Sequence, residues 1–149
     1  MDYYSRGSLA DIMAKDKRTF SEPQIRVIMS QITNALAYLH GKNIIHRDIK
    51  AANILVDDNG DIKVADFGVS TLISQSHRHT RTGSPLWMSP ELLSNSTYSF
   101  KTDIWSLGIT ALELAEGVPP YSHQHPYRAI FSIQSHPPCS LSEPKKWSI

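Results

Sequence analysis

The stretch from residue 100 to residue 116 constrains the fold of this chain more than any other segment. Its apolar side chains recur at spacings that surround most of a helix, and Gly117 with Pro119 and Pro120 gives an end signal. A helix that is apolar on most of its faces belongs in the interior of a domain. We therefore expect a central helix built on Ile104, Trp105, Leu107, Ile109, Ala111, Leu112, Leu114 and Ala115.

A longer helix is predicted between Ser21 and Gly41. Ser21 and Gln24 have the spacing of a capping box, and Gly41 follows the last periodic residue. The apolar residues between them lie on one face of a helix, which predicts an amphipathic element. They are Ile25, Ile28, Met29, Ile32, Leu36 and Leu39. Shorter helices are predicted over residues 9–14 and 125–134.

Two short β-branched runs, residues 54–56 and 62–65, are separated by an Asn59-Gly60 turn signal, which predicts a β-hairpin. Ile44 and Ile45 form another brief apolar stretch. Residues 70–90 are polar and show no periodicity, as is typical of a long surface loop. The expected fold class is therefore α+β, mainly α, with a small hairpin.

Composition excludes some classes of function. A chain of 149 residues with 40% apolar and 19% charged residues fits one globular domain, and a net charge of +1 predicts neither nucleic-acid nor membrane binding. The single Cys139 excludes an internal disulfide framework. The sequence shows no targeting signal and no apolar run long enough to span a bilayer. We therefore expect a soluble, cytoplasmic protein.

Two motifs carry the chemistry. Residues 46–53 read His-Arg-Asp-Ile-Lys-Ala-Ala-Asn, and residues 66–68 read Asp-Phe-Gly directly after the predicted hairpin. Phosphoryl transfer needs one carboxylate to hold Mg²⁺ against phosphate oxygens and another to orient the attacking hydroxyl. An ordinary loop Asp at position 48 and a strand-end Asp at position 66 are the alternatives. The order of the two motifs around an Asn-Gly hairpin, closed by Ser89-Pro90-Glu91, favours the catalytic interpretation.

The chain resembles the C-terminal lobe of a eukaryotic serine/threonine protein kinase, most closely the sterile-twenty-like group in its germinal-centre and Hippo branch. The resemblance extends over nearly the whole chain. Besides the motif residues, it rests on Gly7-Ser8-Leu9, Ala65-Asp66-Phe67-Gly68-Val69, Pro85-Leu86-Trp87-Met88, Asp103-Ile104-Trp105-Ser106-Leu107-Gly108-Ile109-Thr110 and Pro119-Pro120-Tyr121.

The resemblance implies a role for each motif residue. Asp48 would accept the proton of the substrate hydroxyl, and Lys50 would steady the transferring phosphate. Asn53 and Asp66 would bind Mg²⁺. Lys50 resembles the serine/threonine-specific form of the loop, as does Ser84 in the segment that supports the substrate residue. The implied cofactors are ATP and Mg²⁺, and the implied partner is a protein substrate.

Further roles follow from the same resemblance. Asp2 and Tyr4 would present backbone groups to adenine, and Leu55 and Ala65 would line its pocket, although core packing explains these last two equally well. Asp103 would accept backbone N–H groups of the catalytic loop.

Regulation is also implied. Arg47 is expected to pair with a phosphate on the activation segment, where Thr80 is the expected site for an upstream activating kinase. An unmodified polar residue in a loop is the alternative for Thr80.

The G-x-G-x-x-G loop, the strand Lys and its Glu partner do not occur in the chain. We therefore interpret residues 1–149 as a partial kinase domain, from the hinge to the start of the helix after the central helix, without the N-terminal lobe or the last helices. Little activity is expected from the isolated polypeptide. The alternative is a non-catalytic regulatory or binding fragment. A small-molecule phosphotransferase is a weaker alternative, because residues 83–91 resemble a platform for a protein substrate.

Overall fold

The computed structural model describes residues 6–68, 70–72, 84–97 and 99–148. Five α-helices dominate this part of the chain, with two small antiparallel sheets beside them, so the expected α+β, mainly α class is confirmed. The helices are α1 Leu9–Asp16, α2 Glu22–Gly41, α3 Pro90–Leu93, α4 Lys101–Glu116 and α5 Pro126–Ser135. The strands are β1 Ile44–Ile45, β2 Ile54–Val56, β3 Ile62–Val64 and β4 Thr71–Leu72, and the short 3-10 turns are η1 Ala51–Asn53, η3 Pro85–Trp87 and η4 Pro144–Lys146.

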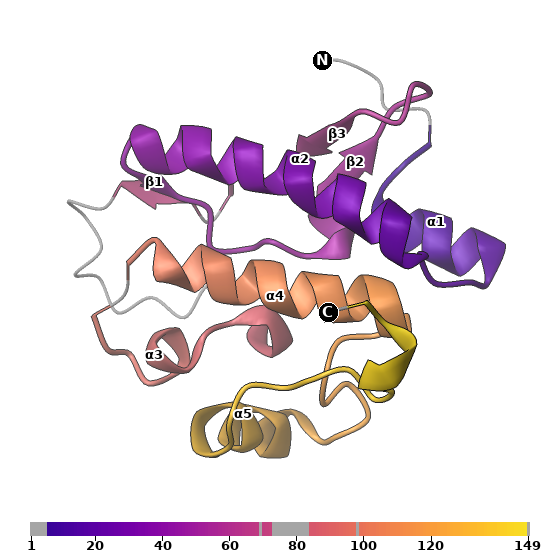
Figure 1. The fold of residues 1–149 in the computed structure, drawn as a ribbon. Helices are drawn as coiled ribbons and strands as arrows, with labels where there is room; N and C mark the ends of the chain where they lie inside the picture. The colour runs from indigo at the N-terminus through magenta and orange to yellow at the C-terminus, as the bar shows by residue number, and fades with distance from the viewer. Residues whose placement is uncertain (1–5, 69, 73–83, 98, 149) are drawn as a thin grey trace.

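Helix α4 runs through the middle of the molecule, as its apolar pattern predicts. In Figure 1, α2 and the β2–β3 hairpin lie on one side of α4, and α3 and α5 lie on the other. The side chains of Leu107 and Leu114 belong to the larger core, which α4 shares with α1, α2 and β2. Ile104 is exposed, so the helix is buried on most but not all of its faces.

Two apolar clusters hold these layers together. The larger includes Ile32 and Leu36 of α2 and Ile54 of β2, all nearly inaccessible to solvent. The smaller joins β1, α3 and α5 through Ile45, Leu92, Leu93 and Ile133, together with Met88. Burial of a large aliphatic side chain stabilises a fold by about 1.5–3 kcal/mol, so these clusters fix the positions of the loops between them.

Helices α1 and α2 begin at capping boxes. The Ser21 N–H donates to Gln24 Oε1 at 2.9 Å, as the sequence predicts, and α2 ends at Gly41. Helix α1 begins with the same arrangement between Ser8 and Asp11. It extends two residues beyond the predicted end at residue 14, because the chain keeps helical geometry until Lys17 adopts a φ of +51°.

The β2–β3 hairpin forms with Leu55 opposite Lys63 and with Gly60 at a φ of +87° in the turn. Its second strand ends at Val64, one residue before the predicted end. The prediction of an irregular loop over residues 70–90 is wrong in two places. Residues Thr71–Leu72 pair with β1 as β4, and Pro85–Trp87 form the turn η3.

Candidate active site

The residues of the first motif meet around the carboxylate of Asp48, which is buried. Asn53 Nδ2 donates to both Asp48 Oδ2 and the Asp48 carbonyl, each at 2.8 Å. The backbone N–H of Ser84 donates to Asp48 Oδ1 at 3.1 Å. Turn η1 explains the first contact, because it folds Asn53 back over the loop five residues after Asp48.

Lys50 links the loop to the segment that contains Ser84. Its ammonium lies 3.0 Å from Asp48 Oδ2 and donates to Ser84 Oγ at 2.6 Å. A single cation therefore bridges a carboxylate and a hydroxyl from segments 34 positions apart. The three side chains therefore form one hydrogen-bonded cluster. Their expected roles as catalytic residue, phosphate-steadying residue and substrate platform stay predictions.

The electrostatics of this cluster favour an ionised Asp48. Burial acts to raise the pKa of this carboxyl, but hydrogen bonds from Lys50, Ser84 and Asn53, together with the Lys50 charge, outweigh it and hold the pKa below its ordinary value. An ionised carboxylate accepts hydrogen bonds and, at its remaining lone pairs, a proton. The Asp48 carboxylate can therefore accept a proton at neutral pH, as its expected role requires.

Asn53 and Asp66 lie near one another, and each has a side-chain oxygen atom of the kind that binds a metal ion. The Ala65 N–H donates to the Asn53 carbonyl at 2.8 Å, which places Asp66 next to the loop. Both hydrogen bonds of the Asn53 side chain to described residues use its nitrogen, so its Oδ1 accepts no hydrogen bond from that part of the chain. Asp66 is exposed and accepts one bond from the Gly68 N–H at 3.1 Å. A Cβ at Gly68 would crowd Asp66 Oδ1 at 3.0 Å.

His46, the first residue of the first motif, contacts the segment that carries the second motif. Its ring is fully buried, with Nε2 3.2 Å from the Ala65 carbonyl, and it contacts the Phe67 ring edge-on at 5.0 Å between centroids. Burial lowers the pKa of His46, although the neighbouring carboxylates oppose this. A neutral ring with a proton on Nε2 can donate to Ala65 and accept the Asp48 N–H at Nδ1.

Asp103 anchors the start of the first-motif loop, residues 46–53, to α4. Its fully buried carboxylate accepts the N–H of His46 at 3.0 Å and of Arg47 at 2.8 Å, so the predicted contact is confirmed. His40 Nε2 lies 2.8 Å from the same carboxylate. Arg47 has a φ of +69°, a conformation that costs a non-glycine residue on the order of 1 kcal/mol or more. The two N–H bonds to Asp103 help to offset that cost.

Glu113 was not predicted to belong to the site, yet it fixes the end of the loop. Its buried Oε2 accepts the Ala51 N–H at 3.0 Å and the Trp87 indole N–H at 2.9 Å. Burial raises the pKa of Glu113, and these two bonds oppose the effect. Thr110 donates to the Ile49 carbonyl at 3.3 Å, between the two acids.

A buried polar stripe runs along α4, made of Asp103, Ser106, Thr110 and Glu113. Positions i, i+3, i+7 and i+10 lie on one face of a helix. Polar side chains at this spacing inside the most apolar helix of the chain were a signal in the sequence. Each of them holds the backbone or the Trp87 indole of a loop in place.

The remaining predicted residues have different outcomes. Leu55 and Ala65 are half-buried, on β2 and just after β3. Their assignment to an adenine pocket stays a prediction. Asp2, Tyr4 and Thr80 lie outside the described residues. Within the described residues, no group of three or more His, Cys, Asp or Glu side chains is placed to hold a metal by itself, and no helix is long and apolar enough to cross a membrane.

Comparison with known proteins agrees with the resemblance noted in the sequence. The family model described as "Protein kinase domain" matches residues 1–146. Over 99% of its length, the chain is 50% identical to serine/threonine-protein kinase pakH of Dictyostelium discoideum and to serine/threonine-protein kinase hippo of Drosophila melanogaster. It is 47% identical over the same share to serine/threonine-protein kinase cst-1 of Caenorhabditis elegans. The match covers 29%, 22% and 30% of these relatives, respectively.

Proposed function

Because this chain belongs to the protein kinase family, we propose that it carries the phosphoryl-transfer centre of a serine/threonine protein kinase. The donor is ATP with Mg²⁺, and the acceptor is a Ser or Thr hydroxyl of a protein. The observation that carries this proposal is the cluster in which Asp48 contacts Lys50 at 3.0 Å and Lys50 contacts Ser84 at 2.6 Å.

The roles follow from the contacts. The substrate hydroxyl oxygen attacks the γ-phosphorus, the bond from that phosphorus to the ADP oxygen breaks, and the hydroxyl proton passes to the Asp48 carboxylate. Lys50 balances charge on the transferring group, because its ammonium lies beside Asp48. Ser84 keeps both groups in position through its N–H and its hydroxyl.

The oxygen atoms of Asn53 and Asp66 fit a hard cation. Mg²⁺ prefers oxygen ligands and is usually bound by one or two carboxylates together with substrate phosphates. Asn53 Oδ1, which accepts no hydrogen bond from the described residues, and the exposed carboxylate of Asp66 form such a partial set of ligands. Mg²⁺ bound there would neutralise charge on the phosphate oxygens. Leu55 and Ala65 would provide apolar contacts to adenine, and Asp2 and Tyr4 its backbone contacts.

The proposal includes regulation by phosphorylation. Arg47 sits between the Asp103 anchor and Asp48, so a phosphate paired with its guanidinium would act directly on the loop. Thr80 is the proposed site, and an upstream kinase is the proposed partner. A cytoplasmic role in signal transduction belongs to the same proposal, supported by the family of the relatives.

A chimera tests the activity. Residues 1–149 would replace the segment that they match in Drosophila hippo, and the purified protein would be incubated with radiolabelled ATP, Mg²⁺ and myelin basic protein. We expect phosphate on Ser and Thr of the substrate. The variant Asp48→Asn should lower kcat by at least about 10²-fold, since it removes the base but keeps the size of the side chain.

Two outcomes would contradict the proposal. One is a chimera that folds and binds ATP but transfers no phosphate, which would favour a binding role for this chain. The other is transfer that Asp48→Asn leaves unchanged. Asp61→Asn, on the exposed hairpin turn, is the matched control and should keep full activity.

A further inference from the structure

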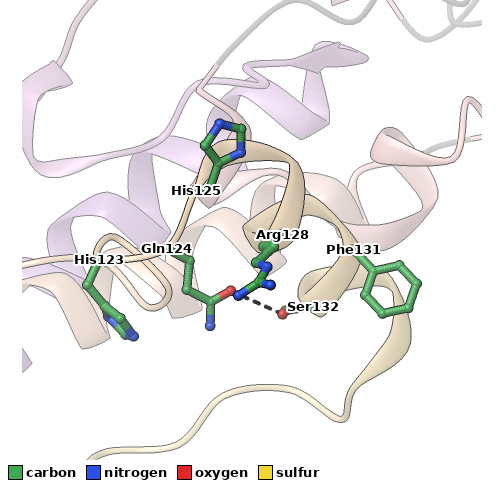
Figure 2. A pocket seen from close by; sticks show the side chains of 6 residues that line it. All are labelled: His123, Gln124, His125, Arg128, Phe131 and Ser132. Carbon is green, nitrogen blue, oxygen red and sulfur yellow. Dashed lines mark hydrogen bonds between the residues drawn. The ribbon is translucent and has the colours of Figure 1, made fainter.

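Helix α5 packs on α3 and η3 through Ala129 and Ile133, and its opposite face borders a pocket of about 610 Å³. The pocket is lined by His123, Gln124, His125, Arg128, Phe131 and Ser132. Figure 2 shows Gln124, Arg128 and Ser132 in its centre, with His123 and Phe131 on opposite sides. None of these residues belongs to the candidate active site.

Contacts within the chain hold the side chains at the centre of the pocket in place. Ser132 Oγ donates to Gln124 Oε1 at 3.3 Å, which ties the loop before α5 to the helix. Arg128 and Ser132 are four residues apart on α5, so their side chains share one helix face. His125 stacks on Tyr127 with 5.6 Å between ring centroids. The guanidinium of Arg128 thus lies beside side chains that are already held in place by contacts within the chain.

The residues that line this pocket include Arg128 and two histidines but no acid. Residues 117–142 contain Arg128 and three histidines but no Asp or Glu. Of the two acids that flank this stretch, Glu116 accepts hydrogen bonds from Ser142 and lines a neighbouring pocket that also includes His123, and Glu143 pairs with Lys146. Among the described residues, no ion pair uses Arg128. An unneutralised cation beside a concave surface favours an anionic partner.

The same surface is also apolar. Tyr127 is 80% exposed and Phe131 is 65% exposed, although both are large aromatic side chains. Aromatic residues and Arg are enriched at the energetically important positions of protein interfaces. A partner that suits this surface carries a carboxylate for Arg128 and an apolar side chain for Phe131.

We propose that the pocket beside α5 is a docking site for an acidic peptide segment of a partner protein. A carboxylate of the segment pairs with the Arg128 guanidinium, which favours planar, two-oxygen acceptors. Gln124 and the histidine rings add hydrogen bonds at its edge. A neighbouring apolar side chain of the segment covers Phe131.

The proposed docking site binds a partner and takes no part in phosphoryl transfer. It lies across α4 from the β2–β3 hairpin (Figure 1), and α5 contacts the turn η3 that follows Ser84. Because the pocket borders the face of α5 that is turned away from η3, a docked segment does not occupy the substrate platform. Its affinity does not require ATP or an intact Asp48, so the failure of this proposal and the failure of the proposed kinase activity are distinguishable.

Binding can be measured by fluorescence anisotropy with the 149-residue chain. The probe is a labelled peptide in which Asp and Glu surround one leucine and one phenylalanine, and the matched peptide has Asn and Gln in place of the acids. We expect saturable binding of the acidic peptide, at least about tenfold weaker binding of the matched peptide, and a similar loss in Arg128→Glu. Phe131→Ser should weaken binding of both peptides.

The control variant is Lys15→Glu, which makes the same charge change on α1, away from the pocket. It should bind the acidic peptide as the wild type does, and far-UV circular dichroism should show that each variant is folded. The proposal is overturned if the acidic peptide does not bind. It is equally overturned if Arg128→Glu and Lys15→Glu weaken binding to the same extent.

Discussion

Asp103 Oδ1 accepts the N–H of Arg47 at 2.8 Å across 56 positions of sequence. This bond and the neighbouring one from His46 hold the loop before Asp48 in a conformation that Arg47 disfavours. The geometry around Asp48 therefore depends on a carboxylate in the central helix that does not touch the reacting groups. Asp103 is a positioning residue.

We predict that Asp103→Asn lowers the free energy of unfolding by about 2–4 kcal/mol. The amide keeps one acceptor, but its NH₂ group faces a backbone N–H or His40, and one buried donor loses its partner. Urea denaturation followed by tryptophan fluorescence measures the change. Asp58→Asn is the control, because the Asp58 side chain is 75% exposed and its ion pair with Arg6 is long at 3.6 Å. That variant should change stability by less than about 0.5 kcal/mol. Equal effects of the two substitutions would contradict the anchoring role.

Local signals in the sequence were sufficient for several elements. The Asn59-Gly60 turn predicted the β2–β3 hairpin, and the pairing of Ser21 with Gln24 predicted the start of α2. Each of these signals lies within a few residues of the feature that it specifies. Asp48, Lys50, Asn53 and Ser84 could be named as one site because the motifs carry the resemblance, and the structure brings these four together.

Non-local contacts could not be predicted in the same way. Thr71 and Leu72 show no strand pattern of their own, and they form β4 because Ile44 and Ile45 offer an edge distant in sequence. Glu113 was missed because an acidic residue near a helix end usually faces water. Its burial results from Ala51 and Trp87, which the fold brings to it.

The second prediction concerns the pH dependence of catalysis. Lys50 lowers the pKa of Asp48 through its hydrogen bond and its charge. In the hippo chimera, Lys50→Met should therefore raise the pKa of the base and move the acid limb of the kcat/KM profile to higher pH. The loss of a cation beside the transferring group should also lower kcat by about 10²-fold.

A matched variant separates these effects from a general loss of charge. Lys101→Met removes an exposed cation at the start of α4 and should leave both kcat and the acid limb unchanged. Ser84→Ala keeps the backbone N–H that bonds to Asp48, so we expect a smaller shift of the limb than in Lys50→Met. An acid limb that stays in place in Lys50→Met would show that Lys50 does not set the proton affinity of the base.

The third prediction concerns the buried acid of α4. Burial raises the pKa of Glu113 above its ordinary value of 4.5, so in the window above 4.5 the native state keeps a proton that the unfolded chain releases. The free energy of unfolding contributed by this group therefore falls as pH rises through that window. Glu113→Gln removes the charge but retains an oxygen that can accept from Ala51 and Trp87. We expect a variant at least as stable as the wild type at pH 7, with a flatter dependence on pH above 4.5, measured by urea denaturation at several pH values.

Glu113→Ala should behave in the opposite way, because it leaves the buried Ala51 N–H and the partly buried Trp87 indole N–H without an acceptor. The cost of an unpaired buried donor is about 1–3 kcal/mol, so a loss of about 2–5 kcal/mol is expected at all pH values. Glu116→Ala, one turn further along α4, removes a carboxylate whose bonds to Ser142 face water, and should cost less than about 1 kcal/mol. If Glu113→Gln proved as unstable as Glu113→Ala, the negative charge itself would be required to hold the loop. The stripe along α4 would then act through charge at both of its ends, at Asp103 as well as at Glu113.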